Sequence, residues 1–525
     1  MNNNIKSGDN KIEEFLSIPK EIKDSVICNG IDSSAEKLME DFVKREADNS
    51  YCLAEFIKFL YLFQKNEYIA KYLDVLTNSL KKHCGEIGIL HKVIPIYAED
   101  LNIFDEEKAD ICLSLILRSI DNRRLSEDKN YREEFRLMIK HVMVYVKRHH
   151  IKIAFGIINK ILSLNLGDDC QIKNIFLNEV EYHQGKVKLD SKPRIAEITL
   201  TNRCNLQCKM CGNIIKEKWE MNRKGVENII KLLPYLESVN WYGGEVGLFK
   251  DFPKLTNIAY LNNVDQNIIT NGLVWTEELI RHVLRGKVSV TVSIDGFDED
   301  GYSYTRGVKK FSEVKDFLKK VNECRNEKTK LMMNTILLRN NAGKIREIEK
   351  FAVENKLDTV YILPLMRWRD DFFEKENIFF EDDGINLKKM NKEIENAYSA
   401  VNELSFNLKK KGIDLVSSLP VIKEGKIQAE KNNKSEDLPV NANNRKTNAC
   451  YAPWKHISVY DEGSLAFSCT CNNKKLMFGN INEDDIFEAW NCEKVQQIRK
   501  NIIKFSLEGR VIEACSEIGC CGAYY

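Results

Sequence analysis

The sequence predicts an α/β fold, a partial (β/α)6 barrel that follows an all-helical domain and precedes a small cysteine-rich domain. Three observations predict this arrangement. Residues 11–185 carry apolar and charged residues at helical spacing, and residues 194–363 alternate strand patterns with helical patterns. Seven of the 16 cysteines lie at or after Cys450. We therefore divide the chain into an all-helical domain (1–190), a barrel (191–422), a polar linker or loop (423–448) and a cysteine-rich domain (449–525).

Length and charge restrict the function classes. The 525 residues are enough for about three domains, at roughly 100–200 residues each. Lysine and arginine number 79 against 78 aspartate and glutamate residues, which gives no electrostatic attraction to nucleic acid or to anionic lipid. No stretch approaches about 18 uncharged apolar residues, and the polar start at Met1–Lys6 lacks the apolar segment of a secretory signal. We expect a soluble, cytoplasmic protein with reduced thiols, whose clustered cysteines bind metal.

The barrel is predicted from six strand patterns separated by helical patterns. The strands are expected at Ile195–Leu200, Val239–Tyr242, Gln266–Thr270, Val288–Ile294, Leu331–Leu337 and Thr359–Leu363. The clearest helical patterns are Gly225–Leu236, Thr276–Leu284, Ser312–Cys324 and Gly343–Asn355, and a longer one, Gly384–Lys411, follows the last strand. Right-handed crossovers make such strands parallel, so ligand chemistry is expected at their carboxyl ends.

Three cysteines directly follow the first predicted strand. Cys204, Cys208 and Cys211 are spaced as Cys-x3-Cys-x2-Cys within Thr201–Gly212. Three thiolates at this spacing can hold an iron–sulfur cube whose fourth iron keeps an open coordination position, and open positions do chemistry. Such a loop can also bind zinc. Two further motifs follow later strands, Trp241-Tyr-Gly-Gly-Glu245 and Ser293-Ile-Asp-Gly296 with Arg306 downstream.

In this order the motifs resemble those of the radical S-adenosylmethionine (SAM) superfamily. The resemblance implies that Cys204, Cys208 and Cys211 hold a [4Fe–4S] cluster whose open iron is chelated by the amino and carboxylate groups of SAM. One electron from the cluster then cleaves SAM to methionine and a 5′-deoxyadenosyl radical, which abstracts hydrogen from the substrate. Sequence offers no catalytic residue beyond this machinery, since the cofactors carry the reaction.

The resemblance also implies where SAM is bound. The Gly-Gly-Glu element contacts its amino group, the serine and the arginine hold its carboxylate, and the asparagine of the fifth strand faces its ribose hydroxyls. A guanidinium fork suits a carboxylate. An alternative is that the arginine is a surface charge on a loop. The six implied residues are Gly243, Gly244, Glu245, Ser293, Arg306 and Asn334.

The carboxyl-terminal cysteines occur in a pattern that is similar to the SPASM/twitch domains of radical SAM enzymes. The similarity is carried by Cys450-Tyr-Ala-Pro-Trp454, Gly479-Asn480 and Trp490-Asn491. It implies one auxiliary [4Fe–4S] cluster, because the Cys-x2-Cys-x5-Cys-x3-Cys run of a second cluster is missing. The implied ligands are Cys450, Cys469, Cys515 and either Cys520 or Cys521. A structural zinc site is the alternative, since ligand type and number do not separate zinc from iron–sulfur.

The function expected from this resemblance is that of a radical SAM oxidoreductase that abstracts hydrogen from a C–H bond. The substrate is expected to be a peptide or protein side chain, as in maturases of ribosomal peptides. A dehydrogenase or epimerase of a sugar or small molecule is the alternative, and a non-catalytic metal-binding or electron-transfer scaffold is the alternative of another class. The expected partner is a low-potential electron donor such as ferredoxin or flavodoxin, with no nucleic acid and no membrane involved.

Overall fold

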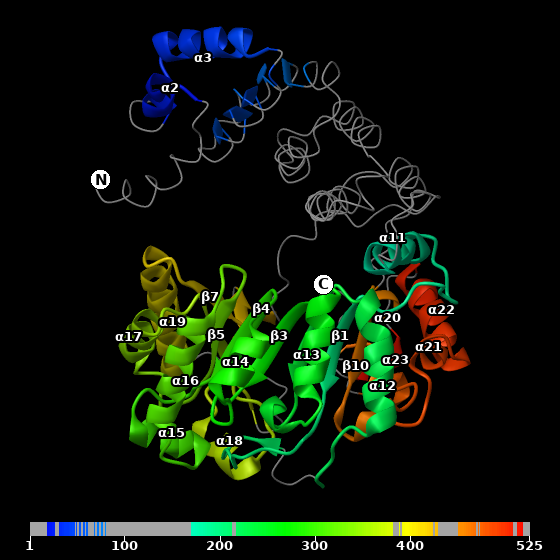
Figure 1. Ribbon diagram of the computed structural model, residues 1–525. Helices are drawn as coiled ribbons and strands as arrows, with labels where there is room; N and C mark the ends of the chain where they lie inside the picture. Colours follow the sequence, from blue (N-terminus) through cyan, green and yellow to red (C-terminus); the bar gives the residue numbers. More distant parts are fainter. Residues whose placement is uncertain are drawn as a thin grey trace. The chain divides into compact units, whose positions relative to one another are not determined.

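A computed structural model gives the structure of the chain (Figure 1). It describes residues 18–26, 31–47 and scattered positions from 49 to 79, and then 170–212, 217–381, 388, 391–423, 426–428, 450–468, 471, 473–507 and 512–517. The chain forms two compact units. One comprises Met1–Gln184 with Glu436–Thr447, and the other comprises Gly185–Ser435 with Asn448–Tyr525. The division of the sequence into four domains stays a prediction.

The described elements of the first unit are all helical. They include α2 (Lys20–Asp24), α3 (Ser33–Arg45) and α11 (Cys170–His183). Helix α3 begins after the Asp32 cap, whose carboxylate accepts hydrogen bonds from the N–H groups of the second and third helical residues, Ser34 and Ala35. Most of the predicted helical domain lies outside the described residues.

The second unit is built on one nine-stranded sheet with the order β11-β10-β1-β2-β3-β4-β5-β6-β7. Strands β1 to β6 are all parallel and follow the chain, which confirms the predicted α/β fold. They are β1 (Ile195–Thr199), β2 (Ser238–Tyr242), β3 (Asp265–Thr270), β4 (Val288–Ser293), β5 (Lys330–Leu337) and β6 (Thr359–Pro364). Each lies within one residue of its predicted bounds, because buried apolar residues fill the strands.

Helices connect the parallel strands, and most of them lie side by side along the sheet (Figure 1). They are α12 (Arg223–Leu232), α13 (Phe252–Leu261), α14 (Glu277–Val283), α15 (Glu299–Arg306), α16 (Phe311–Cys324), α17 (Ile345–Glu354), α18 (Asp370–Glu376) and α19 (Lys392–Lys410). Side-chain caps begin four of them, from Asn222, Thr276, Asp298 and Asn391. Within the pattern predicted over 384–411, the described residues form α19 over Lys392–Lys410, and helices α13, α15 and α18 were not predicted.

Strands that follow β6 in the chain extend the sheet on both sides. Strand β7 (Asp414–Ser417) pairs in parallel with β6. Strand β10 (His456–Val459) pairs in parallel with β1, and β11 (Leu465–Ala466) pairs antiparallel with β10. The cysteine-rich segment therefore contributes two strands to the barrel sheet. A separate hairpin joins β8 (Val421–Lys423) and β9 (Lys426–Gln428).

Helices α20 (Ala452–Lys455), α21 (Ile486–Trp490), α22 (Glu493–Leu507) and α23 (Glu513–Glu517) complete the described part of the cysteine-rich segment. Arg499 of α22 joins them to the chain that leads into β1. Its guanidinium is fully buried and donates to the carbonyl oxygens of Pro453 and Val187 at 2.8 Å and of Trp490 at 3.1 Å. The indole of Trp454 likewise donates to the Lys186 carbonyl at 2.8 Å. The Pro-Trp and Trp-Asn motifs are thus structural anchors.

Across the described residues, no helix is long and apolar enough to cross a membrane.

We expect Arg499→Ala to lower the free energy of unfolding by about 3 kcal/mol or more, because it leaves several buried carbonyl groups without a donor. The control is Arg223→Ala, whose 94% exposed side chain pairs only with Glu227 one turn away, and it should cost less than about 0.5 kcal/mol. Urea unfolding of both variants measures the difference. Equal costs would show that Arg499 is not an anchor.

Candidate active site at the carboxyl ends of the strands

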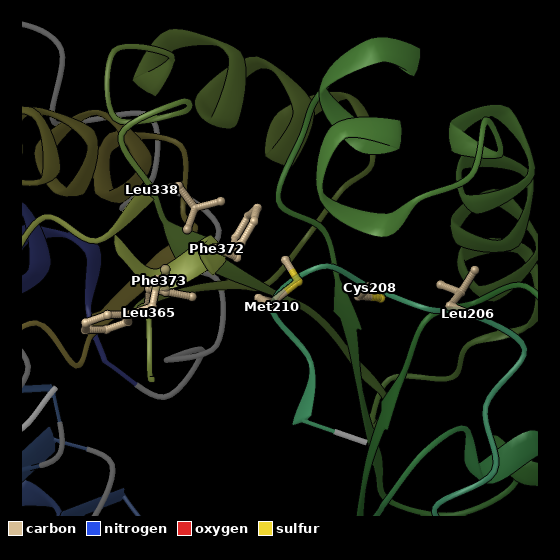
Figure 2. Packing of buried hydrophobic residues seen from close by; sticks show 7 residues of the cluster. All are labelled: Leu206, Cys208, Met210, Leu338, Leu365, Phe372 and Phe373. Carbon is tan, nitrogen blue, oxygen red and sulfur yellow. The ribbon is translucent and has the colours of Figure 1, made fainter. Parts of the chain in front are cut away.

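The three cysteines lie on the loop that leaves β1. The Cys208 side chain is buried, and those of Cys204 and Cys211 are half-buried. Cys208 belongs to an apolar cluster, the remaining members of which come from this loop and from the segments after β5 and β6 (Figure 2). They are Leu206, Met210, Leu338, Leu365, Phe372 and Phe373. These side chains exclude water from one side of the cysteine loop.

Burial changes the acidity of the thiols. It raises the pKa of Cys204 to about 11 and also raises the pKa of Cys208. Burial therefore favours the protonated form of both thiols, and a metal that binds them would have to displace their protons.

A glycine turn fixes the beginning of the cysteine loop. The N–H of Gly244 donates to the Thr201 carbonyl at 2.7 Å, and the N–H of Glu245 donates to the Arg203 carbonyl at 2.8 Å. A Cβ on Gly243 would lie 2.2 Å from the Thr201 oxygen, and one on Gly244 would lie 2.1 Å from the Arg203 oxygen. Only glycine permits this approach of two backbones.

The carboxylate of Glu245 is fully buried and ties the turn after β2 to the turn after β3. It accepts hydrogen bonds from the Thr270 hydroxyl at 2.6 Å, the Asn271 N–H at 2.8 Å and the Trp275 indole at 3.2 Å. Burial raises the pKa of Glu245, and these hydrogen bonds act in the opposite direction. Both carboxylate oxygens already have donors from the chain.

Arg306 lies at the end of α15 and is 9% exposed. Its Nη2 pairs with the buried carboxylate of Asp295, and its Nη1 donates to the sulfur of Cys208 at 3.7 Å. Burial opposes its charge, but Asp295 and Cys208 outweigh burial and raise the pKa of Arg306. The alternative that Arg306 is a surface charge on a loop is wrong, because Asp295 holds it inside the fold.

Asn271 is a site residue that sequence reasoning did not assign. It directly follows β3, and its Nδ2 donates to the Asn205 side chain at 2.8 Å and to the sulfur of Cys204 at 3.7 Å. Its Oδ1 accepts from the Leu273 N–H at 3.0 Å. The sequence signal that could have identified Asn271 was its position at the carboxyl end of a strand, where the cysteine loop and the glycine turn also lie.

The other two predicted SAM contacts are neighbours. Ser293 at the end of β4 and Asn334 in β5 are opposite each other in the sheet register, and both are half-buried. The structure therefore brings them together beside Asp295 and Arg306. Their roles toward SAM stay a prediction.

The described carboxyl-terminal cysteines lie in short segments. Cys450 directly precedes α20, and Cys515 lies in α23. Asn473 connects α23 with the loop of Cys471, because its Nδ2 donates to the Ala514 carbonyl at 3.2 Å and its N–H donates to the Cys471 carbonyl at 2.8 Å. Of the predicted ligands, Cys469, Cys520 and Cys521 lie outside the described residues.

The donors of the cysteine loop fit an iron–sulfur cube, because three cysteine side chains lie together on one loop and a cube binds each thiolate through a different iron. Arg306 also fits an anionic ligand, since its Nε is buried and has no hydrogen-bond acceptor among the described residues.

Two family models match the chain. Residues 198–352 match the radical SAM superfamily, and residues 450–521 match SPASM, described as an iron–sulfur cluster-binding domain. The first range contains the cysteine loop, the glycine turn and Arg306. The second contains every predicted ligand of the auxiliary cluster.

Two curated proteins are similar to part of the chain. The sporulation killing factor maturation protein SkfB of Bacillus subtilis is 32% identical over 146 residues, which is 25% of this chain and 33% of SkfB. The 7,8-dihydro-6-hydroxymethylpterin dimethyltransferase of Methanocaldococcus jannaschii is 25% identical over 173 residues, which is 31% of this chain and 34% of that protein. The matches thus span about a third of either relative.

Among solved structures, the fold is similar to that of Streptococcus suis SuiB bound to S-adenosylmethionine. The TM-score is 0.48 at 13% identity, over 76% of this chain and 84% of SuiB.

We expect Gly244→Ala to destabilise the fold by about 1–3 kcal/mol, because its Cβ would overlap the Arg203 carbonyl oxygen and backbone must shift. The matched control is Gly343→Ala, whose Cβ would meet no atom within 4 Å. Urea unfolding of the metal-free proteins compares them. A Gly244 variant as stable as the control would contradict the close approach of the two loops.

Proposed function

This chain is a radical SAM protein with a carboxyl-terminal SPASM iron–sulfur domain, and we propose that it oxidises a C–H bond in a peptide or protein side chain. Its cofactors are SAM and [4Fe–4S] clusters. When bound, the core cluster supplies one electron to SAM, and the 5′-deoxyadenosyl radical so formed takes a hydrogen atom from the substrate. The protein has to bind, orient and shield these cofactors.

The observation that carries the proposal is the buried pair of Arg306 and Asp295 beside Cys208. A guanidinium that is held inside the fold next to a proposed cluster ligand, with no acceptor for Nε among the described residues, supports a role in binding the SAM carboxylate. We assign Cys204, Cys208 and Cys211 as the ligands of the core cluster.

The backbone of the Gly243–Glu245 turn is proposed to meet the SAM amino group. The carboxylate of Glu245 already accepts from Thr270, Asn271 and Trp275, so its main effect is to hold this turn against the turn after β3. Ser293 and Asn334 are proposed to contact the SAM carboxylate and the ribose hydroxyls, respectively. Their adjacent positions in β4 and β5 support binding of one ligand by both.

A peptide or protein substrate is supported by the similarity to SkfB, which is by name a maturation protein. The similarity to a pterin methyltransferase shows that related domains act on small molecules, so oxidation or epimerisation of a sugar or other small molecule is the second candidate. Incubation of the reconstituted enzyme with a candidate peptide deuterated at one position tests the proposal. Transfer of that deuterium to 5′-deoxyadenosine is expected.

We propose one auxiliary cluster, with Cys450, Cys469, Cys515 and either Cys520 or Cys521 as ligands. It would accept an electron from the substrate or organise the substrate pocket. Reduction of the core cluster needs a low-potential donor, and we propose ferredoxin or flavodoxin, in the cytoplasm. A non-catalytic scaffold would bind metal without cleaving SAM.

Replacement of all three core cysteines by alanine should abolish formation of 5′-deoxyadenosine, because no residue then holds the core cluster. The matched control is the double variant Cys450→Ala/Cys515→Ala, which should lose about half of the iron and still cleave SAM without converting substrate. Iron analysis and quantification of 5′-deoxyadenosine under reducing conditions compare the two. SAM cleavage by the triple variant would reject the assignment, and unchanged iron in the double variant would favour zinc at the auxiliary site.

Arg306→Lys should weaken SAM binding by about 1.5–3 kcal/mol, roughly 10- to 150-fold in Kd, since a lysine keeps the charge beside Asp295 but loses the fork. Lysine is chosen because alanine would leave Asp295 buried without a partner. Arg325→Lys, next to Asp358 at the opposite ends of the strands, is the control. Anaerobic equilibrium dialysis measures both affinities. Equal affinities would place the carboxylate contact elsewhere.

A further inference from the structure

Two side-chain N–H groups from outside the cysteine loop reach the sulfur atoms of two different cysteines. Nδ2 of Asn271 lies 3.7 Å from the sulfur of Cys204, and Nη1 of Arg306 lies 3.7 Å from the sulfur of Cys208. Asn271 follows β3 and Arg306 ends α15, so separate elements supply the two donors. Both distances are within the range of hydrogen bonds to sulfur.

A buried carboxylate holds each donor in place. Glu245, with no exposed surface, accepts the backbone N–H of Asn271 at 2.8 Å. Asp295, 2% exposed, pairs with Arg306 and also accepts the Ile336 N–H at 2.8 Å. Asn271 is fixed further, because its amide donates to Asn205 and accepts from Leu273. The two N–H groups are therefore oriented before any cluster is present.

Hydrogen bonds to the sulfur ligands are one of the terms that set the reduction potential of an iron–sulfur cluster. Reduction by one electron increases the negative charge on the cluster and its thiolates. An N–H dipole or a guanidinium aimed at a ligand sulfur stabilises that charge, and the effect is large where water is excluded. The apolar cluster around Cys208 provides such a surrounding.

We propose that Asn271 and Arg306 are positioning residues that raise the reduction potential of the core cluster through Cys204 and Cys208. The inference rests on the proposed function, because it requires the core cluster. The step is [4Fe–4S]2+ plus one electron from the flavodoxin or ferredoxin donor, giving [4Fe–4S]+. Both N–H protons stay on nitrogen throughout.

Asn271→Asp tests the proposal most directly. An aspartate keeps the oxygen that accepts from the Leu273 N–H but removes the donor to Cys204 and adds a negative charge. The control is Asn267→Asp in β3, the strand that Asn271 follows, where Nδ2 of Asn267 donates to the Asn240 side chain at 2.7 Å. It introduces the same charge without touching a cysteine.

The readout is the midpoint potential of the reconstituted full-length protein, from redox titration monitored by electron paramagnetic resonance without SAM. The signal that later changes on addition of SAM identifies the core cluster. We expect Asn271→Asp to shift the reduction equilibrium at least tenfold toward the oxidised cluster, which is about 59 mV more negative for one electron. Asn267→Asp should have the same midpoint potential as the wild type.

The outcomes separate this inference from the proposed function. A wild-type protein without a SAM-sensitive cluster would reject the proposed function. A normal cluster with equal midpoint potentials in Asn271→Asp and wild type would reject only the role of the hydrogen bonds. If Asn271→Asp fails to retain iron, the midpoint potential of Arg306→Lys tests the proposal instead. Arginine uses one nitrogen for Asp295 and another for Cys208, whereas the lysine has a single ammonium group for both. An unchanged potential there would overturn the proposal.

Discussion

The close approach of two backbones, at Thr201–Arg203 and at Gly243–Glu245, is the constraint on which the rest of the site depends. Two hydrogen bonds join these segments at distances that leave no room for a Cβ on either glycine. The contact sets where the cysteine loop begins after β1. It also sets the position of Glu245, because the same turn carries its carboxylate into the buried space between β2 and β3.

Two buried carboxylates connect the core of the fold with the cysteine loop. The carboxylates of Glu245 and Asp295 are both buried, and each accepts hydrogen bonds from donors near the cysteine loop. Without these donors, either buried carboxylate would lower the stability of the fold. Each is therefore coupled to a group that reaches a cysteine, so side chains that stabilise the fold also orient the polar groups around Cys204 and Cys208.

The sequence predicted the barrel well, because six buried strands of a parallel sheet are short apolar runs that helices separate. It also singled out the cysteine loop and Arg306, since both follow strands in recognisable motifs, and the structure places the Arg306 side chain against Cys208. It could not predict the helix that carries Arg306, because Gly301 interrupts its pattern, nor the partners of Glu245. The partners of Glu245 come from the turn after β3, which reaches Glu245 only in the folded structure. The pairing of β10 with β1 joins residues too far apart for any local pattern.

That last pairing has a consequence for synthesis of the protein. Ile195 of β1 lies opposite His456 of β10, which is 261 residues later in the chain. At roughly 5–20 residues per second, a ribosome needs roughly 10–50 s to make the intervening segment. During that time β1, with the cysteine loop at its end, presents an unpaired edge on which other chains can add.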